Sequence, residues 1–258
     1  MAAAGGAPLL VWLRLEPGEV LRRLREGTSL IRRSEWTGWA PSALLGRKLG
    51  GKVLGIVGMG RIGQAVAFRA RAFGLTIRYH NRHRLPQAVE AMFGAEYVAE
   101  LDGLVEQADI LTLHCPATPE TRGLLDARRI GLMKPGATLV NTARADLVDY
   151  EAMIAALERG DLGGAGLDVF PEEPKVDARL VALPNVIAQP HIGSATIEGR
   201  EASGEKVIAN IRFWADGHRP PALDPRGHGD DPALLARPFT QGRQRLTPGH
   251  PQLCVLGR

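Results

Sequence analysis

The sequence predicts an α/β protein in which helices cover both faces of a doubly wound parallel sheet. Three observations support this fold class: a glycine-rich turn separates a short apolar run from an amphipathic stretch, apolar runs then alternate with helical stretches as far as residue 193, and polar residues follow several of these runs. Such alternation is typical of βαβ units, whose strands pair in parallel. Because ligands of such sheets bind beyond the carboxyl ends of the strands, we expect the functional residues there.

The first of these units gives the strongest signal. Residues 53–57 form an apolar run, as a strand buried on both faces requires, and Gly58, Gly60 and Gly63 follow it as G-x-G-x-x-G. The first glycine permits a tight turn, the second lets the backbone approach a pyrophosphate, and the third lets the next helix pack closely on the strand. The pattern therefore predicts a dinucleotide-binding turn. The residues of this turn that we expect at the cofactor are Gly58, Gly60, Arg61, Ile62 and Gly63.

The end of the second strand, expected at residues 76–79, indicates which dinucleotide binds. An NAD site usually places Asp or Glu about 20 residues beyond the glycines, whereas a site for the 2′-phosphate of NADP has an Arg nearby. Residues 80–84 read HNRHR and contain no acidic residue. We therefore expect NADPH as the cofactor and NADH as the weaker alternative, with Asn81, Arg82 and Arg84 at the phosphate. The alternative interpretation is a basic turn in solvent.

The alternation continues beyond this basic turn. We expect helices at residues 86–93, 101–107 and 126–133 and strands at residues 97–98, 108–115 and 137–141. The strand of residues 108–115 ends in Cys115 and Pro116, which we expect to line the cofactor crevice near the nicotinamide. For the Cys115 thiol, a role as a small buried apolar group is an equal alternative.

Three polar clusters stand at or just after the ends of later strands. Arg144 follows the strand that ends at Asn141, and an Arg at this edge can hold a carboxylate in a fork of hydrogen bonds. Asp168 ends another strand and precedes an acidic turn, and His191 follows a proline at the end of the last. Each residue alone also fits a surface arginine, a turn carboxylate or a satisfied histidine. Beside a nucleotide-binding fold, the three together indicate catalysis.

The composition argues against several other classes of protein. A length of 258 residues with 45% hydrophobic and 23% charged residues fits one large or two small globular domains. The net charge of +4 comes with scattered Arg residues and only 5% aromatic residues, so we expect no nucleic acid as a partner. Cys115 and Cys254 have neither disulfide nor metal-site spacing, and we expect no metal. Because no apolar run could span a bilayer, we expect no membrane association and a cytoplasmic location.

The two ends of the chain carry weaker patterns. Residues 19–25 and residues 41–45 could form short helices before the first strand. Trp36 and Trp39 are expected to pack against a neighbouring element or subunit. A long helix is expected at residues 194–214, and the residues beyond 221 are rich in Pro, Gly and Arg without periodicity, which predicts disorder.

Four motifs in this order carry a resemblance to a known family: GMGRIGQAVAFRARAFG, VNTAR, GLDVFPEEP and QPHIGSATIEGR. Over about residues 36–221, they resemble the D-isomer-specific 2-hydroxyacid dehydrogenases, and within them the bacterial glyoxylate/hydroxypyruvate reductase branch. The resemblance implies a catalytic set that falls here on Arg144, Glu173 and His191. Glu173 is preferred to Glu172 because the family pattern places the carboxylate directly before a proline.

The chemistry of these side chains agrees with the roles that the resemblance implies. His191 can give a proton to the developing alkoxide, a carboxylate such as Glu173 on its other ring nitrogen would stabilise the imidazolium, and Arg144 can bind the substrate carboxylate. For Asp168, a place near the nicotinamide or its ribose and a structural role at the strand end are equal alternatives. The remaining residues that we expect at the cofactor are Thr142, Ala143, Asp168 and Gly193.

The resemblance also implies a domain organisation. Family members carry a further α/β domain before the nucleotide fold, which grips the substrate carboxylate, and Ala145 and Tyr150 depart from the family's usual Gly and acidic residue. We expect a remnant of that substrate-binding domain at residues 1–35, an NAD(P)-binding Rossmann domain at residues 36–193, a helix returning toward the absent domain at residues 194–221, and a disordered tail at residues 222–258.

The expected activity is NAD(P)-dependent reduction of glyoxylate or hydroxypyruvate, weakened by the missing domain. The resemblance further implies a homodimer that forms through the nucleotide-binding domain. The alternative is a nucleotide-binding remnant or an NADPH-sensing interaction module without turnover, as in the family's corepressor relatives.

Overall fold

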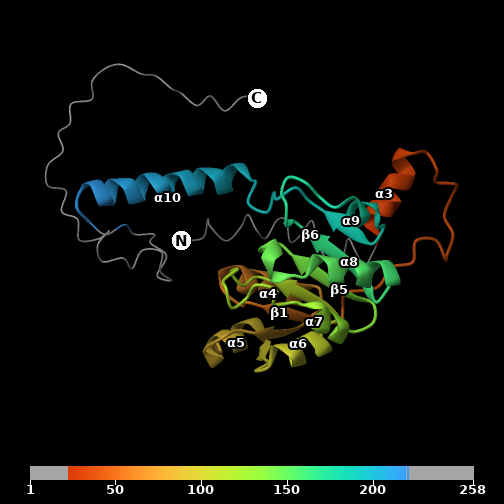
Figure 1. The fold of residues 1–258 in the computed structure, drawn as a ribbon, viewed down its shortest axis with the longest axis horizontal. Coiled ribbons are helices and arrows are strands. Elements are labelled where there is room, and N and C mark those ends of the chain that lie inside the picture. Colours follow the sequence, from red (N-terminus) through yellow and green to blue (C-terminus); the bar gives the residue numbers. More distant parts are fainter. Residues whose placement is uncertain (1–22, 219, 221–258) are drawn as a thin grey trace, which may run out of the picture. The chain divides into compact units, whose positions relative to one another are not determined.

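The computed structural model describes residues 23–218 and residue 220 (Figure 1). The described residues as far as Arg200 form one compact unit, and those from Glu201 belong to a second unit. The expected disordered tail at residues 222–258 and most of the expected remnant at residues 1–35 lie outside the described residues.

The first unit is built on a seven-stranded sheet whose order is β3-β2-β1-β4-β5-β6-β7. Every neighbouring pair of strands is parallel. Chain order reverses between β1 and β4, which is the point at which ligands of such sheets bind. The predicted fold class, an α/β protein with a doubly wound parallel sheet, is confirmed. The strands are β1 Val53–Val57, β2 Thr76–His80, β3 Ala95–Tyr97, β4 Ile110–Leu113, β5 Ala137–Asn141, β6 Leu162–Leu167 and β7 Val186–Ala188.

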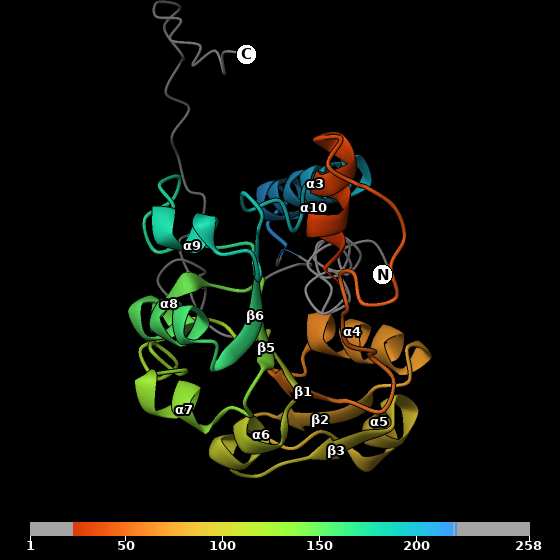
Figure 2. The ribbon, with the colours of Figure 1, turned by 90° about the vertical axis from the view of Figure 1, so that its right-hand side faces the viewer.

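Helices cover both faces of this sheet. Figure 2 shows α4 and α5 on one side and α7 and α8 on the other. Each side has its own buried apolar cluster, one centred on β1, β2 and α4 and the other reaching from α6 to α8. The helices of this unit are α3 Leu24–Arg32, α4 Arg61–Ala72, α5 Gln87–Phe93, α6 Leu101–Gln107, α7 Ala127–Leu132, the 3₁₀ helix η1 Ala145–Leu147, α8 Tyr150–Arg159 and α9 Ala178–Ala182.

Helix α10, at Ile197–Ala215, begins in the first unit and lies mostly in the second. Its side chains are exposed or half-buried, as expected for a helix whose apolar residues have no core of their own. No helix among the described residues is long and apolar enough to cross a membrane. Within the same residues, no three His, Cys, Asp or Glu side chains gather as metal ligands would.

The sequence located most of these elements but not all. The bounds of α6 and β5 agree with the prediction, while α8 and α9 had no prediction although Asp149 and Asp177 cap their first turns. The short helix expected at residues 41–45 is wrong, because the chain forms only a turn there. Trp39 is 84% exposed in the single chain, so of the two expected partners its packing against a neighbouring subunit stays a prediction.

Candidate active site

The glycine-rich turn between β1 and α4 has room for side chains at only one of its three glycines. Gly58 has a φ of +95°, and a Cβ there would lie 2.5 Å from the backbone nitrogen of Cys115 on the neighbouring strand end. A Cβ at Gly63 would lie 2.5 Å from the carbonyl oxygen of Gly58. Gly60 faces open space. The first two contacts close the turn, and the open side at Gly60 is where a diphosphate can approach the backbone.

The start of α4 supplies donors for such a group. The N–H groups of Arg61, Ile62 and Gly63 lie in the first helical turn, where no earlier carbonyl of the helix can accept from them. Gln64 already donates its N–H to the carbonyl of Gly60 at 2.9 Å. Anions are stabilised at a helix N-terminus of this kind. The residues therefore fit the diphosphate of a dinucleotide.

The basic turn of residues 80–84 contacts the glycine turn through two residues. The carbonyl of His80 accepts from the backbone N–H of Gly58 at 3.0 Å. The side-chain oxygen of Asn81 accepts from the backbone N–H of Met59 at 2.7 Å. The side chain of Arg82 is exposed. Arg84, in contrast, donates from Nε and Nη2 to the carboxylate of Glu90 at 2.9 and 2.8 Å. The structure thus places Asn81 at the predicted site and commits one edge of Arg84 to a carboxylate that the sequence reasoning did not consider.

The end of β4 lies against the glycine turn, as its place next to β1 requires. Cys115 packs beside Gly58, and burial raises the pKa of its thiol to about 11. The thiol is therefore neutral near neutral pH and behaves as a small apolar group. Pro116 is exposed, and its carbonyl accepts from the hydroxyl of Thr121 at 2.7 Å.

The bend after β5 is held by the buried side chain of Asn141. Asn141 donates from Nδ2 to the carbonyl of Arg144 at 2.9 Å and accepts from the N–H of Ala143 at 3.1 Å. These bonds fold residues 142–144 into a tight bend, in which Thr142 and Ala143 are half-buried. The side chain of Arg144 is exposed and keeps its cationic group at the carboxyl edge of the sheet.

Asp168 joins the ends of β6 and β7. It is 1% exposed, and its two oxygens accept from the backbone N–H groups of Ile192 at 2.9 Å and Gly193 at 2.7 Å. Burial raises the pKa of this carboxyl group. Of the two alternatives left open by the sequence, these contacts support the structural one, because Asp168 holds the segment that carries His191.

His191 and Glu173 lie against each other at this edge. The ring nitrogen Nδ1 of His191 is 2.7 Å from Oε2 of Glu173, and since a carboxylate only accepts, Nδ1 carries the hydrogen. The other carboxylate oxygen accepts from the N–H of Phe170 at 2.9 Å. Glu172 instead lies 3.8 Å from Lys175. The choice of Glu173 over Glu172 therefore agrees with the geometry.

The electrostatics link all three residues of the expected catalytic set. The hydrogen bond from His191 lowers the pKa of the Glu173 carboxyl group, and the charges of His191 and Arg144 lower it further. Glu173 is therefore ionised at neutral pH and Nε2 of His191 is left for another partner. The side chains of His191 and Glu173 remain 49% and 36% exposed.

Tyr150 is a neighbour that the sequence reasoning noted only as a departure from the family pattern. It begins α8, and its hydroxyl donates to the carbonyl of Val169. Burial raises its pKa, and the charge of Glu173 adds to the effect. Its position directly after a capping Asp, at the start of an apolar-periodic stretch, was the available signal for a half-buried residue that supports the turn of Glu173.

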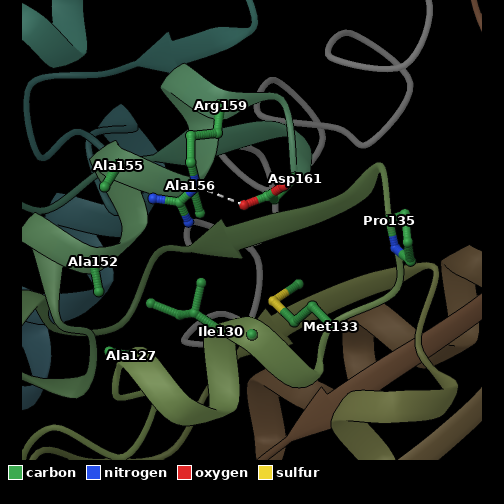
Figure 3. Close-up of a pocket in the computed structure, with 10 residues that line it drawn as sticks. Ala127, Ile130, Met133, Pro135, Ala152, Ala155, Ala156, Arg159 and Asp161 are labelled. Carbon is green, nitrogen blue, oxygen red and sulfur yellow. Dashed lines mark hydrogen bonds and ion pairs between the residues drawn. The ribbon is translucent and has the colours of Figure 1, made fainter.

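A separate groove of about 310 Å³ lies between α7 and α8 (Figure 3). Ala127, Ile130, Met133 and Ala156 provide much of its lining. The two charged side chains at its edge, Arg159 and Asp161, pair with each other at 2.8 Å. It contains none of the residues that the sequence singled out, so it is not the candidate site.

Comparisons with known proteins place this chain in a family. The family described as D-isomer specific 2-hydroxyacid dehydrogenase, NAD binding domain, matches residues 18–193. A glyoxylate reductase from Thermococcus litoralis is 48% identical over 208 residues, which cover 79% of this chain and 62% of that protein.

Two solved structures are also similar to this chain. A glyoxylate reductase from Paecilomyes thermophila has a TM-score of 0.75 at 39% identity, covering 83% of this chain and 63% of that one. An NADPH-dependent glyoxylate/hydroxypyruvate reductase from Sinorhizobium meliloti, in complex with NADP and malonate, has a TM-score of 0.74 at 32% identity, covering 83% and 65%.

The family match covers more than half of the chain, and it includes the glycine turn and the segment of His191. The chain spans 62% of the length of the Thermococcus litoralis relative. The resemblance seen in the sequence motifs is thereby confirmed. This chain belongs to the D-isomer specific 2-hydroxyacid dehydrogenase family and contains its NAD-binding domain.

Proposed function

We propose that this chain takes part in the NADPH-dependent reduction of a small 2-oxo acid, glyoxylate or hydroxypyruvate, to the 2-hydroxy acid. The observation that carries the proposal is the His191–Glu173 pair at 2.7 Å, at the same edge of the sheet as the glycine turn and Arg144. The relatives named glyoxylate reductase and glyoxylate/hydroxypyruvate reductase support the choice of substrate class.

Each residue of the catalytic set has one task in this reaction. The nicotinamide, when bound, supplies a hydride to the carbonyl carbon of the substrate. Nε2 of the protonated His191 ring gives a proton to the carbonyl oxygen as negative charge develops on it, while Glu173 holds the opposite nitrogen and stabilises the imidazolium. Arg144 binds the substrate carboxylate and fixes the carbonyl beside His191.

The NADPH preference rests on the turn after β2. This turn has no acidic residue, and Arg82 is exposed there. A carboxylate at this position would repel the 2′-phosphate, whereas Arg attracts it. The Sinorhizobium meliloti relative, described as NADPH-dependent and bound to NADP, supports the same choice.

The exposure of the catalytic pair sets the expected rate. With the side chains of His191 and Glu173 at 49% and 36% exposed, water screens the electrostatic stabilisation of the transition state. We expect slow turnover for this chain by itself. The same exposure favours a second candidate function, in which the chain binds NADPH as a sensing or interaction module and turns nothing over.

We also propose that the chain forms a homodimer through the nucleotide-binding domain. Trp36 and Trp39 are 60% and 84% exposed in the single chain, and large aromatic side chains of this kind are typical of interfaces. Sedimentation analysis of the chain and of its Trp39→Ser variant tests this proposal. A monomeric wild-type chain would contradict it.

A cofactor-oxidation assay with glyoxylate and hydroxypyruvate tests the proposed reaction. We expect measurable NADPH oxidation by the wild-type chain and a loss of about 10²- to 10⁴-fold in kcat for His191→Ala, because the proton donor is removed. NADPH binding should be unchanged in this variant. Equal rates for the two proteins would contradict the assigned role, and NADPH binding without any turnover would favour the sensing module.

A further inference from the structure

A buried carboxylate lies behind the basic turn of residues 80–84. The side chain of Glu90 is 8% exposed, yet both of its oxygens are used. Oε1 accepts from the hydroxyl of Tyr79 at 2.8 Å and from Nε of Arg84 at 2.9 Å, and Oε2 accepts from Nη2 of Arg84 at 2.8 Å. The hydrogen bonds from Arg84 and then from Tyr79 lower the pKa of Glu90, so it is ionised.

This cluster of Tyr79, Arg84, Glu90 and Tyr97, which we call the Glu90 anchor, fixes the C-terminal end of the basic turn. Besides donating to Glu90, the hydroxyl of Tyr79 accepts from the backbone N–H of Leu85 at 2.9 Å. The guanidinium of Arg84 lies 5.7 Å from the centre of the Tyr97 ring. The side chain of Arg84 thus lies between the carboxylate of Glu90 and the ring of Tyr97. The backbone of the following residue, Leu85, is bonded to Tyr79.

The N-terminal end of the turn is fixed by the same cluster and by the glycine turn. The hydroxyl of Tyr97 donates to the carbonyl of Asn81 at 3.3 Å. The side-chain oxygen of Asn81 accepts from Met59, between the first two glycines, at 2.7 Å. The Glu90 anchor therefore connects the turn after β2 to the predicted diphosphate site.

Between these two fixed ends stand Arg82 and His83, whose side chains are exposed. Arg84 differs from Arg82, because the edge formed by its Nε and Nη2 is occupied by Glu90. An arginine binds a phosphate best through such a two-nitrogen edge. The two-nitrogen edge of Arg84 that would bind a phosphate is therefore already used, while Arg82 makes no such pair with Glu90.

We propose that Glu90 and Arg84 are positioning residues for cofactor selection, which hold the basic turn so that Arg82 binds the 2′-phosphate of NADPH. The inference rests on the NADPH preference proposed above. The rival arrangement is direct binding, in which Arg84 leaves Glu90 and contacts the phosphate itself.

Fluorescence titration of the full chain with NADPH and NADH separates these arrangements. For Arg82→Ala, we expect a loss of NADPH affinity of about 10- to 100-fold, the usual effect of removing a charged hydrogen bond. For Arg84→Ala and for Glu90→Gln, we expect equal losses of NADPH affinity of about 2- to 10-fold. In each variant the basic turn is no longer held in place, so it has to become ordered when NADPH binds. The double variant Arg84→Ala/Glu90→Gln should be no weaker than either single one, since the two residues act as one unit.

Direct binding by Arg84 predicts the opposite pattern. Glu90→Gln would then strengthen NADPH binding by releasing the guanidinium, and Arg84→Ala would weaken it as much as Arg82→Ala does. Either result overturns the proposal. Equal wild-type affinities for NADPH and NADH would overturn the cofactor preference itself, and this inference with it. A wild-type preference for NADPH together with either result above would overturn the positioning role alone.

The NADH titrations and a matched variant control for general damage. NADH affinity should change less than twofold in all four variants, whereas a merely structural role would reduce the binding of both cofactors or only the melting temperature. Glu96→Gln breaks a different arginine pair, between Arg78 on β2 and Glu96 on β3 at 3.1 Å, and should leave the ratio of the two affinities unchanged. A shift of this ratio in Glu96→Gln as large as that in Glu90→Gln would overturn the assignment to Glu90.

Discussion

The glycine turn and the edge of the sheet with the proposed catalytic residues Arg144, Glu173 and His191, here the catalytic edge, are built in different ways. At the glycine turn, the shape comes from backbone contacts that leave no space for a Cβ at Gly58 or Gly63. At the catalytic edge, His191 and Glu173 are part-exposed side chains, and the buried Asp168 fixes the backbone of the segment that carries His191. The difference teaches that a change at Gly58 or Gly63 affects folding and binding together, whereas a change at His191 can affect chemistry alone.

The largest effect on stability is expected at Gly58. An added Cβ in Gly58→Ala meets the backbone of Cys115 at 2.5 Å, and the φ of +95° is strained for alanine. We expect a loss of about 2–4 kcal/mol in the free energy of unfolding, from strain and overpacking together. Urea denaturation monitored by circular dichroism measures it.

Gly60→Ala is the matched control for this prediction. Its Cβ would face open space, so the free energy of unfolding should stay within about 0.5 kcal/mol of the wild-type value, while the affinity for NADPH falls because the methyl group stands where the diphosphate approaches. If Gly58→Ala were as stable as Gly60→Ala, the steric description of the turn would be wrong.

Asp168→Asn probes the buried support of the catalytic edge. The amide nitrogen of Asn cannot accept a hydrogen bond, so the N–H of Ile192 or of Gly193 loses its partner. We expect a loss of about 1–3 kcal/mol in the free energy of unfolding and a lower kcat, because the segment of His191 is released. Thermal denaturation beside the cofactor-oxidation assay measures both. A stable variant with normal kcat would contradict the structural role of Asp168.

The difference between the two regions also explains how much the sequence could predict. The glycine turn was readable because its spacing is local, and the short helix expected at residues 101–107 has the bounds of α6. The partner of Arg84 was not readable, because Glu90 meets it only after α5 folds back over the end of β2. The same holds for Asp168, whose partners lie 24 and 25 residues further along the chain and meet it through the pairing of β6 and β7.

The smallest effects are expected at the acidic turn, where Glu172 and Glu173 stand side by side in the sequence and differ in their partners. Because the pKa of Glu173 is lowered in the folded state, its stabilising contribution is present above its ordinary pKa of 4.5 and is lost as the pH falls through the lower folded value. For this part-exposed pair we expect a contribution of about 0.2–1 kcal/mol.

Urea denaturation of Glu173→Gln and Glu172→Gln over a range of pH compares the two residues. Near neutral pH, Glu173→Gln should be less stable than the wild-type chain, and the difference should shrink steadily as the pH falls below 4.5, because the wild-type carboxylate then becomes protonated as well. Glu172→Gln removes only an exposed contact of 3.8 Å with Lys175, so it should stay within about 0.5 kcal/mol of the wild-type chain throughout. If the two variants had the same stability at every pH, the pairing of His191 with Glu173 would be wrong.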